Sequence, residues 1–314
     1  MASNSMTCSY KNCDQGKTIK QEDGRVDVRG FHVSKKERKE LAADWSEDGL
    51  ATFHQACWNL LCKSRSGDLE GVKLSKTEAK LIDEATKTAE FHDSEDCFQR
   101  EADRIADMLK NASYCIGFTG AGISTAAGIG DFRGIHGKWT NNDKVKQYGA
   151  SSLSSSSTKV VKRNYRLPTY THEAIVKLMD MNIVKYLISQ NTDGLHRLSG
   201  IHAEKISELH GNGFQEKCEK CGIRVLRKSN TRDKSSQAKV PALKCPRCKI
   251  NHRTGNKCQQ PGCDGFMMNT IINFGDYLEG PILQAAQDNA EKSDVVLCLG
   301  TTLRVTPAAD LVVE

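Results

Sequence analysis

Three close pairs of cysteines lie between residues 218 and 263, and metal binding is the chemistry that such pairs favour. They occur in a stretch rich in Lys and Arg and poor in periodic apolar residues, as Cys218-x2-Cys221, Cys245-x2-Cys248 and Cys258-x4-Cys263. Thiolates at such spacings are typical zinc ligands, and four of them complete a tetrahedral shell with no position left for water. We therefore expect a structural zinc ion here, for which four of the six thiols suffice.

A second group of candidate ligands belongs to the start of the chain. Cys8 and Cys13 form one pair, and His54 and Cys57 form another. A Cys-x4-Cys pair and a His-x2-Cys pair could together fill a tetrahedral zinc site. The pairs are far apart in the sequence, so ordinary buried thiols are an equally open interpretation. Cys62 is a further candidate ligand.

Three other segments carry residues suited to a nucleotide and to proton transfer. In GAGIS, at residues 120–124, glycines would let backbone N–H groups approach a pyrophosphate, although a tight turn alone could also require them. The polar segment from Gln190 to His196 could bind a ligand or could simply cap a turn. His210, in ELHGN, can accept a proton near neutral pH, although a lone histidine is usually structural.

These segments need buried strands to position them. Short apolar runs at residues 114–118, 183–188 and 295–299 predict such strands, and helices are predicted over 98–110 and 171–181. This alternation predicts an α/β fold with a parallel sheet. Cys115 and Cys298 lie within apolar runs, so we expect them to be small core residues. GAGIS is not the GxGxxG of a dehydrogenase, and Asp143, at the distance of a ribose-binding acid, follows no apolar strand.

The remaining sequence indicates how the chain is divided. Its 314 residues fit two or three domains. Residues 1–70 predict a small zinc-binding module without a long periodic helix or strand, and residues 71–97 predict a helical linker. Ser151–Ser157 predicts a flexible surface loop. Residues 211–269 interrupt the α/β pattern and predict an inserted module.

Composition and charge narrow the function classes. Thirteen cysteines and a start without an apolar signal sequence favour a reducing compartment. No apolar stretch approaches the roughly 20 residues needed to cross a bilayer, so we expect a soluble protein. Residues 224–257 hold eleven Lys or Arg and one acid. This stretch could attract nucleic acid or an acidic protein surface, or it could be an ordinary solvated insertion.

Taken together and in order, the motifs resemble those of the sirtuin family. They are GAGISTAAGIGDFRG, SQNTDGLHRLSG, ELHGN, Cys-x2-Cys with a later cysteine pair, INFGD and LCLGTTLRVTPA, within residues 98–314. The segments HRTGNKC and MNTIINFGD look most like the class IV branch, which includes nuclear members. The resemblance implies a Rossmann-like parallel sheet with an inserted small zinc-binding module.

The resemblance also implies an activity, namely NAD-dependent protein-lysine deacylation (deacetylation). In that reaction the acyl group of an acylated lysine, on a protein such as a histone, is transferred to ADP-ribose and nicotinamide is released. NAD is a co-substrate and zinc is structural. His210 would be the general base that deprotonates a ribose hydroxyl, and Asn191 would join it as a catalytic residue.

Further roles follow from the resemblance residue by residue. The family's cofactor-binding positions match Gly120, Ala121, Gly122, Ser124, Asp131, Phe132, Arg133, Gln190, Asn191, Asp193, Gly300, Thr301 and Thr302. Within this set, residues 131–133 would form a mobile loop that covers the nicotinamide ribose. Phe274 and Gly275 would contribute to an acyl-lysine tunnel. The implied zinc ligands are Cys218, Cys221, Cys258 and Cys263, with Cys245 and Cys248 as replacements.

Departures from the family pattern keep other functions open. Gly130 stands where the family usually has proline, which loosens the loop that follows. The chain ends at DLVVE, where we expect the final strands of the family to follow, so it is a fragment or its nucleotide site is incomplete. The alternatives are a catalytically impaired chromatin or nucleic-acid binding module and a protein mono-ADP-ribosyltransferase. The branch resemblance and basic stretch favour a nuclear location, with the cytoplasm as the other choice.

Overall fold

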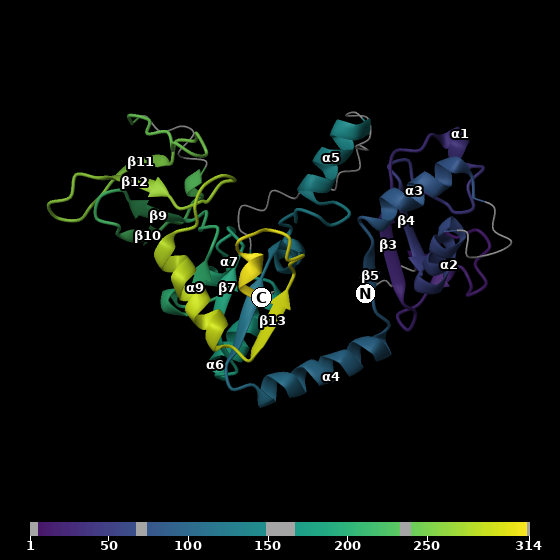
Figure 1. Cartoon of the computed structure of the whole chain (residues 1–314), viewed down its shortest axis with the longest axis horizontal. Coiled ribbons are helices and arrows are strands. Elements are labelled where there is room, and N and C mark those ends of the chain that lie inside the picture. The colour runs from purple at the N-terminus through teal and green to yellow at the C-terminus, as the bar shows by residue number, and fades with distance from the viewer. Residues whose placement is uncertain (1–5, 67–73, 149–166, 233–239, 313–314) are drawn as a thin grey trace. The chain divides into compact units, whose positions relative to one another are not determined.

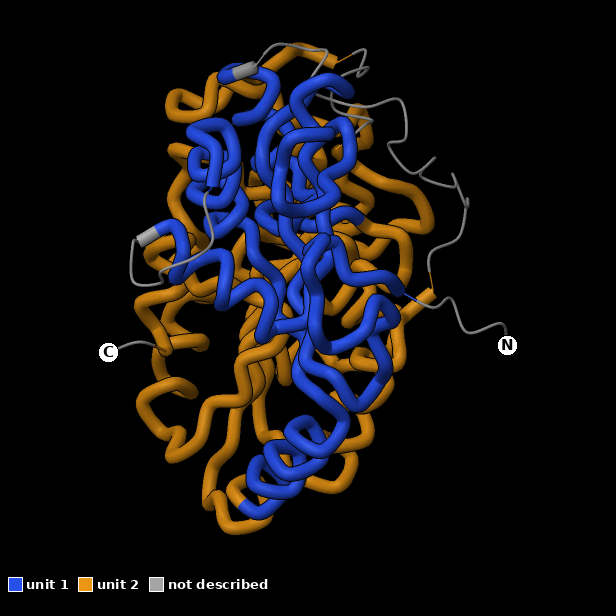
Figure 2. The backbone as a smooth tube through the Cα atoms, turned by 90° about the vertical axis from the view of Figure 1, so that its right-hand side faces the viewer, with its two compact units in different colours: residues 1–107, 130–162 blue, residues 108–129, 163–314 orange. Residues whose placement is uncertain are grey.

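The chain forms two compact units. The computed structural model describes residues 6–66, 74–148, 167–232 and 240–312. The first unit comprises residues 1–107 and 130–162, and the second comprises residues 108–129 and 163–314 (Figure 2). The predicted Ser151–Ser157 loop lies outside the described residues. In the described part of the chain, no helix combines the length and apolar character needed to cross a bilayer.

The second unit is built on a four-stranded sheet in which every pairing is parallel (Figure 1). Its strands, in the order β13-β6-β7-β8, are β6 (Cys115–Thr119), β7 (Val184–Ser189), β8 (Ile206–Glu208) and β13 (Val295–Leu299). Ile116 and Phe118 contribute to a core cluster with Ala286 of α9 (Gly280–Lys292). Leu187 contributes to another with Ile175 of α6 (Tyr170–Asp180). Both faces are covered, which explains the continuous apolar runs and confirms the predicted α/β fold.

The sheet changes winding direction between β6 and β13. From β6 the chain adds β7 and then β8 on one side, and β13 later pairs on the other side of β6. In open α/β sheets such a switch point is where ligands bind, beyond the carboxyl ends of the strands. Gly120 N–H donates to Leu299 O at 3.0 Å, and Gly122 N–H donates to Gly300 O at 2.8 Å. A Cβ on Gly122 would lie 2.8 Å from the Gly300 Cα, so close approach of the two strand ends requires glycine.

The insertion forms a separate antiparallel sheet. Its order is β10-β9-β12-β11, with β9 (Gln215–Cys218), β10 (Arg224–Leu226), β11 (Arg253–Lys257) and β12 (Phe266–Asn269). Short helical segments complete the described part of the second unit, and they are η1 (Ala121–Ala127), α7 (Leu195–Leu198), η3 (Ala203–Lys205) and η4 (Ala309–Val312). The helix α4 (Glu95–Asn111) runs from the first unit into the second and includes the predicted helix at 98–110.

The first unit has its own core around an antiparallel sheet. Strand β3 (Arg25–Arg29) lies between β4 (Leu50–His54) and β5 (Glu90–His92), and β1 (Met6–Thr7) pairs with β2 (Thr18–Ile19). The helices are α1 (Lys35–Arg38), α2 (Gln55–Ser66), α3 (Lys76–Thr86) and α5 (Lys138–Tyr148). Leu81 and Ile82 of α3 pack into the same core as Trp58 of α2.

The helix α2 corrects one expectation, because residues 1–70 do contain a long helix. Its apolar positions Cys57, Trp58 and Leu61 are all buried, and they follow helical spacing. Cys57 is both a core position of this helix and a candidate metal ligand. The predicted domain boundaries at residues 70 and 97 stay predictions.

Candidate active site and metal centres

His210 lies at the carboxyl edge of the parallel sheet, two residues after β8. Its ring Nδ1 is 3.0 Å from the backbone oxygen of Gln190, which follows β7. A carbonyl oxygen can only accept a hydrogen bond, so Nδ1 carries the proton and Nε2 keeps its lone pair. Burial lowers the pKa of His210, while the bond to Gln190 acts in the opposite direction. The ring is therefore neutral at pH 7 and has a basic nitrogen to offer.

The backbone after His210 is held tightly. Gly211 has a φ of 77°, and a Cβ there would lie 1.8 Å from the backbone oxygen of Thr270. Only glycine fits this position. Ile272 N–H donates to His210 O at 3.0 Å, which connects the histidine to the segment that carries Phe274 and Gly275.

Gln190 and Asn191 connect His210 to the glycine-rich turn. Asn191 Nδ2 donates to Gly120 O at 3.0 Å. Gln190 Oε1 accepts a hydrogen bond from Thr301 Oγ1 at 2.9 Å, whereas its Nε2 is buried and has no partner among the described residues. An unsatisfied buried amide costs about 1–3 kcal/mol. This N–H group could therefore donate to a polar ligand bound at the switch point.

Ser124 and Asp193 bond to each other. Ser124 Oγ donates to Asp193 Oδ2 at 2.7 Å, and Asp193 Oδ1 accepts from Leu195 N–H at the start of α7. Ser124 is fully buried. The pair thus fastens η1 to the start of α7, a contact that no sequence pattern predicted.

The end of β13 completes the switch point. Gly300 has a φ of 60° and abuts Gly122, and Thr301 reaches Gln190 as described. Thr302 is exposed. The structure thus brings the three predicted cofactor segments of the second unit, GAGIS, QNTD and GTT, to one edge of the sheet.

The predicted covering residues, Asp131, Phe132 and Arg133, belong to the first unit. Phe132 is 48% exposed, and its ring stacks on Trp139 with the ring centroids 6.4 Å apart. The segment that follows is anchored within that unit, because the Arg29 guanidinium donates to Ile135 O at 2.9 Å and to Asn141 Oδ1 at 2.6 Å.

Two buried histidines lie beside each other at the site, and only His196 belongs to a segment that the sequence had singled out. His172 and His196 have ring centroids 4.8 Å apart, and His196 Nε2 lies 2.9 Å from Thr119 Oγ1 at the end of β6. Burial lowers the pKa of both histidines, that of His196 to about 3. The pair is therefore neutral and supports the strand ends. Its sequence signal was a histidine at the start of each helix that borders β7.

Glu208 gives the site a pH-dependent stability. Burial raises its pKa to about 7, against the opposing 2.7 Å hydrogen bond from Asn212 Nδ2. A carboxyl group whose pKa is raised on folding stabilises the folded state below its unfolded pKa of about 4.3, and this contribution disappears as the pH rises through 7. The folded chain at pH 8 must therefore hold a buried carboxylate.

Replacing Glu208 with glutamine should relieve that cost. We expect Glu208→Gln to raise the free energy of unfolding by about 1–3 kcal/mol at pH 8 and to change it little at pH 5. Denaturant titrations at the two pH values measure this. Glu204→Gln, at a side chain that is 73% exposed, is the matched control. An equal pH dependence in Glu208→Gln and the parent chain would contradict the assignment.

Four thiols come together at one end of the inserted sheet. The sulfur atoms of Cys218, Cys221, Cys258 and Cys263 all lie within 4.8 Å of one another. Two of the separations, Cys218–Cys263 and Cys221–Cys258, are 3.6 Å. A Zn–S distance of about 2.3 Å places tetrahedral sulfur atoms about 3.8 Å apart, so this group fits zinc. Cys245 and Cys248 do not join it.

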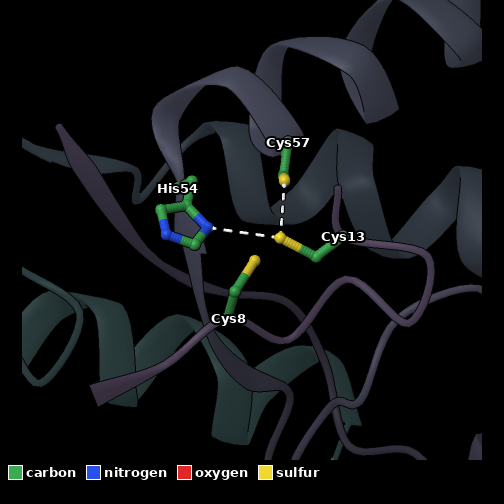
Figure 3. A group of neighbouring side chains, drawn as sticks. All are labelled: Cys8, Cys13, His54 and Cys57. Carbon is green, nitrogen blue, oxygen red and sulfur yellow. Dashed lines mark hydrogen bonds between the residues drawn. The ribbon is translucent and has the colours of Figure 1, made fainter. Parts of the chain in front are cut away.

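The N-terminal candidate ligands also converge. Cys8, Cys13, His54 and Cys57 point toward a common centre, with Cys13 Sγ 3.4 Å from His54 Nδ1 and 3.5 Å from Cys57 Sγ (Figure 3). His54 and Cys57 flank the start of α2, and both are buried. His54 Nε2 lies 3.5 Å from Asp23 Oδ2, the arrangement in which a carboxylate orients a metal-bound imidazole.

Two smaller expectations change with the structure. Cys298 is exposed, whereas Cys115 is buried, so the core prediction was correct only for Cys115. Within the basic stretch, Arg224 pairs with Glu279, Arg227 Nε lies 2.6 Å from Glu216, and Arg253 Nε lies 2.8 Å from Glu219. These acids lie outside the stretch, so its positive charge is partly compensated.

Comparison with known proteins gives consistent matches. The model of the Sir2 family matches residues 120–307. The NAD-dependent protein deacetylase SRT1 of Arabidopsis thaliana is 37% identical over 223 residues, which are 71% of this chain and 42% of the relative. The NAD-dependent protein deacetylase sirtuin-7 of Bos taurus is 31% identical over 300 residues, which are 94% of this chain and 66% of the relative.

Solved structures match as well. A Sir2 homologue in complex with ADP-ribose has 25% sequence identity and a TM-score of 0.46, and the match covers 66% of this chain and 78% of that one. The chain spans less than half the length of SRT1 and about two thirds of the length of sirtuin-7.

Proposed function

This chain belongs to the Sir2 family, and we propose from that membership and from the site that it is an NAD-dependent protein-lysine deacylase. The observation that carries the proposal is the fixed position of His210, whose Nδ1 bonds Gln190 O next to the glycine-rich turn. The similarity to sirtuin-7 is consistent with the class IV branch.

His210 acts as the general base in this proposal. Its Nε2 lone pair would accept the proton of a hydroxyl group on the ribose of bound NAD. The acyl group would then pass to that oxygen as its bond to the lysine nitrogen breaks. The lowered pKa keeps this nitrogen unprotonated at neutral pH, as a base requires. Because Nδ1 keeps its proton and donates it in the hydrogen bond to Gln190 O, the ring does not need to rotate before it reacts.

We assign the cofactor-binding role to the segments at the edge of the sheet. NAD supplies a glycosidic bond that breaks when nicotinamide leaves. The turn formed by Gly120, Ala121 and Gly122 lets the pyrophosphate approach the backbone closely, with the N–H groups of Gly120 and Gly122 fixed on Leu299 O and Gly300 O. The free Gln190 Nε2 suits a ribose or amide oxygen. Asn191 holds the glycine-rich turn through its hydrogen bond to Gly120 O, and Ser124 holds η1 through its hydrogen bond to Asp193. We therefore propose Asn191 as a positioning residue beside His210.

The other proposed cofactor contacts come from the ends of three segments. Asp193 orients Ser124, and the Gly300–Thr302 turn faces the cofactor from β13, with Thr301 holding Gln190. For Asp131, Phe132 and Arg133 we keep the role that the family resemblance implies, which is to cover the nicotinamide ribose, with Phe132 excluding water. Exclusion of water is essential because a reactive glycosyl centre would otherwise hydrolyse.

Two structural zinc ions are part of the proposal. One is bound by the four thiolates of the inserted sheet, and the other by the N-terminal group of Cys8, Cys13, His54 and Cys57. Both sets are closed, with four protein ligands each, so neither ion takes part in the chemistry. Residues 1–70 would then owe much of their stability to metal.

The substrate class and the location are inferred from the family resemblance and not from the geometry of the site. We propose an acylated lysine on a protein, with histones as candidates, and a nuclear location, from the resemblance to the class IV branch. The basic stretch favours nucleic-acid or chromatin binding less than its sequence suggested, because three of its arginines are in ion pairs. No feature of the site favours transfer of ADP-ribose to protein.

Incubation with NAD and an acetyl-lysine peptide tests the proposal. Release of nicotinamide should require the acetylated peptide, and the same peptide with free lysine should release none. Salt-sensitive binding of nucleic acid without any NAD consumption would instead favour the binding-module alternative.

A further inference from the structure

Four side chains of metal-binding type meet beside the inserted sheet, apart from the four-thiolate group. The ligand atoms of Cys245, Cys248, His252 and Asp276 all lie within 4.8 Å of one another. Cys245 Sγ is 3.1 Å from Asp276 Oδ1, and Cys248 Sγ is 3.2 Å from His252 Nε2. Ligand atoms of tetrahedral zinc lie about 3.3–3.8 Å apart, so the group has the dimensions that zinc requires.

The loop at Cys245 has the same construction as the metal-binding loop at Cys218. In one loop Lys220 N–H points to Cys218 Sγ at 3.4 Å, and in the other Arg247 N–H points to Cys245 Sγ at the same distance. In each loop the first cysteine also donates its N–H to the carbonyl five residues later, at 2.9 Å, and accepts from the N–H four residues later.

The fifth residue of each loop, four positions after the first cysteine, is left-handed. Gly222 has a φ of 73°, and Lys249 has a φ of 61°. This conformation costs about 1–2 kcal/mol for a residue with a Cβ. The second loop therefore keeps the shape of the first even where the sequence makes that shape unfavourable.

A neighbouring amide orients the imidazole. His252 Nδ1 lies 3.3 Å from Asn269 Oδ1, and Asn269 N–H donates to His252 O at 2.8 Å. With Nδ1 directed at Asn269, Nε2 faces the sulfur and carboxylate atoms. Metal-bound histidines almost always have such a partner on the second ring nitrogen.

The fourth ligand comes from outside the insertion. Asp276 is in the loop formed by residues 273–277, and its Oδ2 accepts from Asn273 N–H at 3.1 Å. The same loop contacts the cysteine loop again, because the Arg247 guanidinium lies 3.2 Å from the Tyr277 ring centroid. Phe274 is 75% exposed between these contacts.

We propose that this group binds a zinc ion of its own and that the ion fastens the 273–277 loop to the inserted sheet. The ligands are Cys245, Cys248, His252 and Asp276. Two thiolates, one imidazole and one carboxylate form a closed tetrahedral set, so the ion is structural. Its effect on peptide binding rests on the proposed function, in which Phe274 and Gly275 contact the acyl-lysine.

Zinc content measures the site directly. Zinc per full-length chain, measured by inductively coupled plasma mass spectrometry, should fall by one equivalent in the double variant Cys245→Ser/Cys248→Ser. Cys97→Ser, outside all three groups, should leave it unchanged. An unchanged zinc content in the double variant would overturn the proposal.

Alkylation of the unmodified chain tests the same site without relying on the folding of a variant. Iodoacetamide labelling of the zinc-bound protein, resolved by peptide mass spectrometry, should leave Cys245 and Cys248 protected while Cys97 reacts. A chelator should then expose both. Labelling of Cys245 and Cys248 as fast as Cys97 before chelation would rule the site out.

The consequence for substrate is measured separately. The double variant should raise the KM for the acetyl-lysine peptide by about tenfold and leave the KM for NAD unchanged, because only the peptide loop is released. An unchanged peptide KM would exclude the loop-fastening role. A parent chain that never consumes NAD, together with loss of one zinc equivalent in the double variant, would refute the proposed function and leave the metal site standing.

Discussion

Replacing His210 with alanine should slow deacylation of an acetyl-lysine peptide by about 10²–10⁴-fold, the usual contribution of a general base. The variant removes the only group that we assign to proton transfer. It also removes one hydrogen bond, from Nδ1 to Gln190 O, which is worth about 0.5–1.5 kcal/mol, so the fold should persist. Chromatographic separation of the acetylated and free peptides measures the rate.

His202 provides the control for this experiment. Its side chain is 80% exposed, and we assign it no part in the site at the sheet edge, so His202→Ala should keep the parent rate. Thermal unfolding of both variants shows whether the fold survives. A folded His210→Ala chain that deacylates within a few-fold of the parent rate would remove His210 as the base.

Removal of zinc from the four-thiolate group should unfold the inserted sheet. Cys218→Ser takes away a ligand that is 1% exposed, at the end of β9. Structural zinc binding contributes about 10–16 kcal/mol in small zinc modules, and that energy is folding energy. We expect loss of one zinc equivalent and rapid proteolysis between residues 211 and 269. Cys298→Ser, an exposed thiol outside the metal groups, should change neither.

The N-terminal group provides a parallel case. Cys57→Ser should release its own zinc equivalent and expose the first unit to proteolysis, because Cys57 is in the same core as Trp58 and Leu61. The inserted sheet should stay protected in this variant. Protease resistance at residues 1–66 in zinc-free protein would show that apolar packing alone sustains the unit.

The parallel sheet could be predicted because its strands are buried on both faces. Residues 115–119 and 184–189 are apolar almost throughout, so the sequence marks them without an alternating pattern. The strand β13 was predicted for the same reason, but Cys298 in its equally apolar run is exposed, because β13 is at the edge of the described sheet. Burial on both faces depends on neighbours that a single strand does not encode.

Part of the site could also be predicted from the buried strands. Polar residues after buried parallel strands must meet at one edge, which placed His210 beside Gln190. The pairing of Cys245 with Asp276 could not be predicted, because the two residues are 31 positions apart and a whole hairpin lies between them. The Cys-x2-Cys-x3-His spacing that ends at His252 was the signal available in the sequence. Spacing identifies local ligands, and only the fold identifies distant ones.

The product of the reaction tests the central claim most directly. Mass spectrometry of NAD and an acetyl-lysine peptide after incubation with the chain should detect O-acetyl-ADP-ribose and free lysine peptide in equal amounts. ADP-ribose attached to the peptide, or NAD left intact beside a fully acetylated peptide, would contradict it.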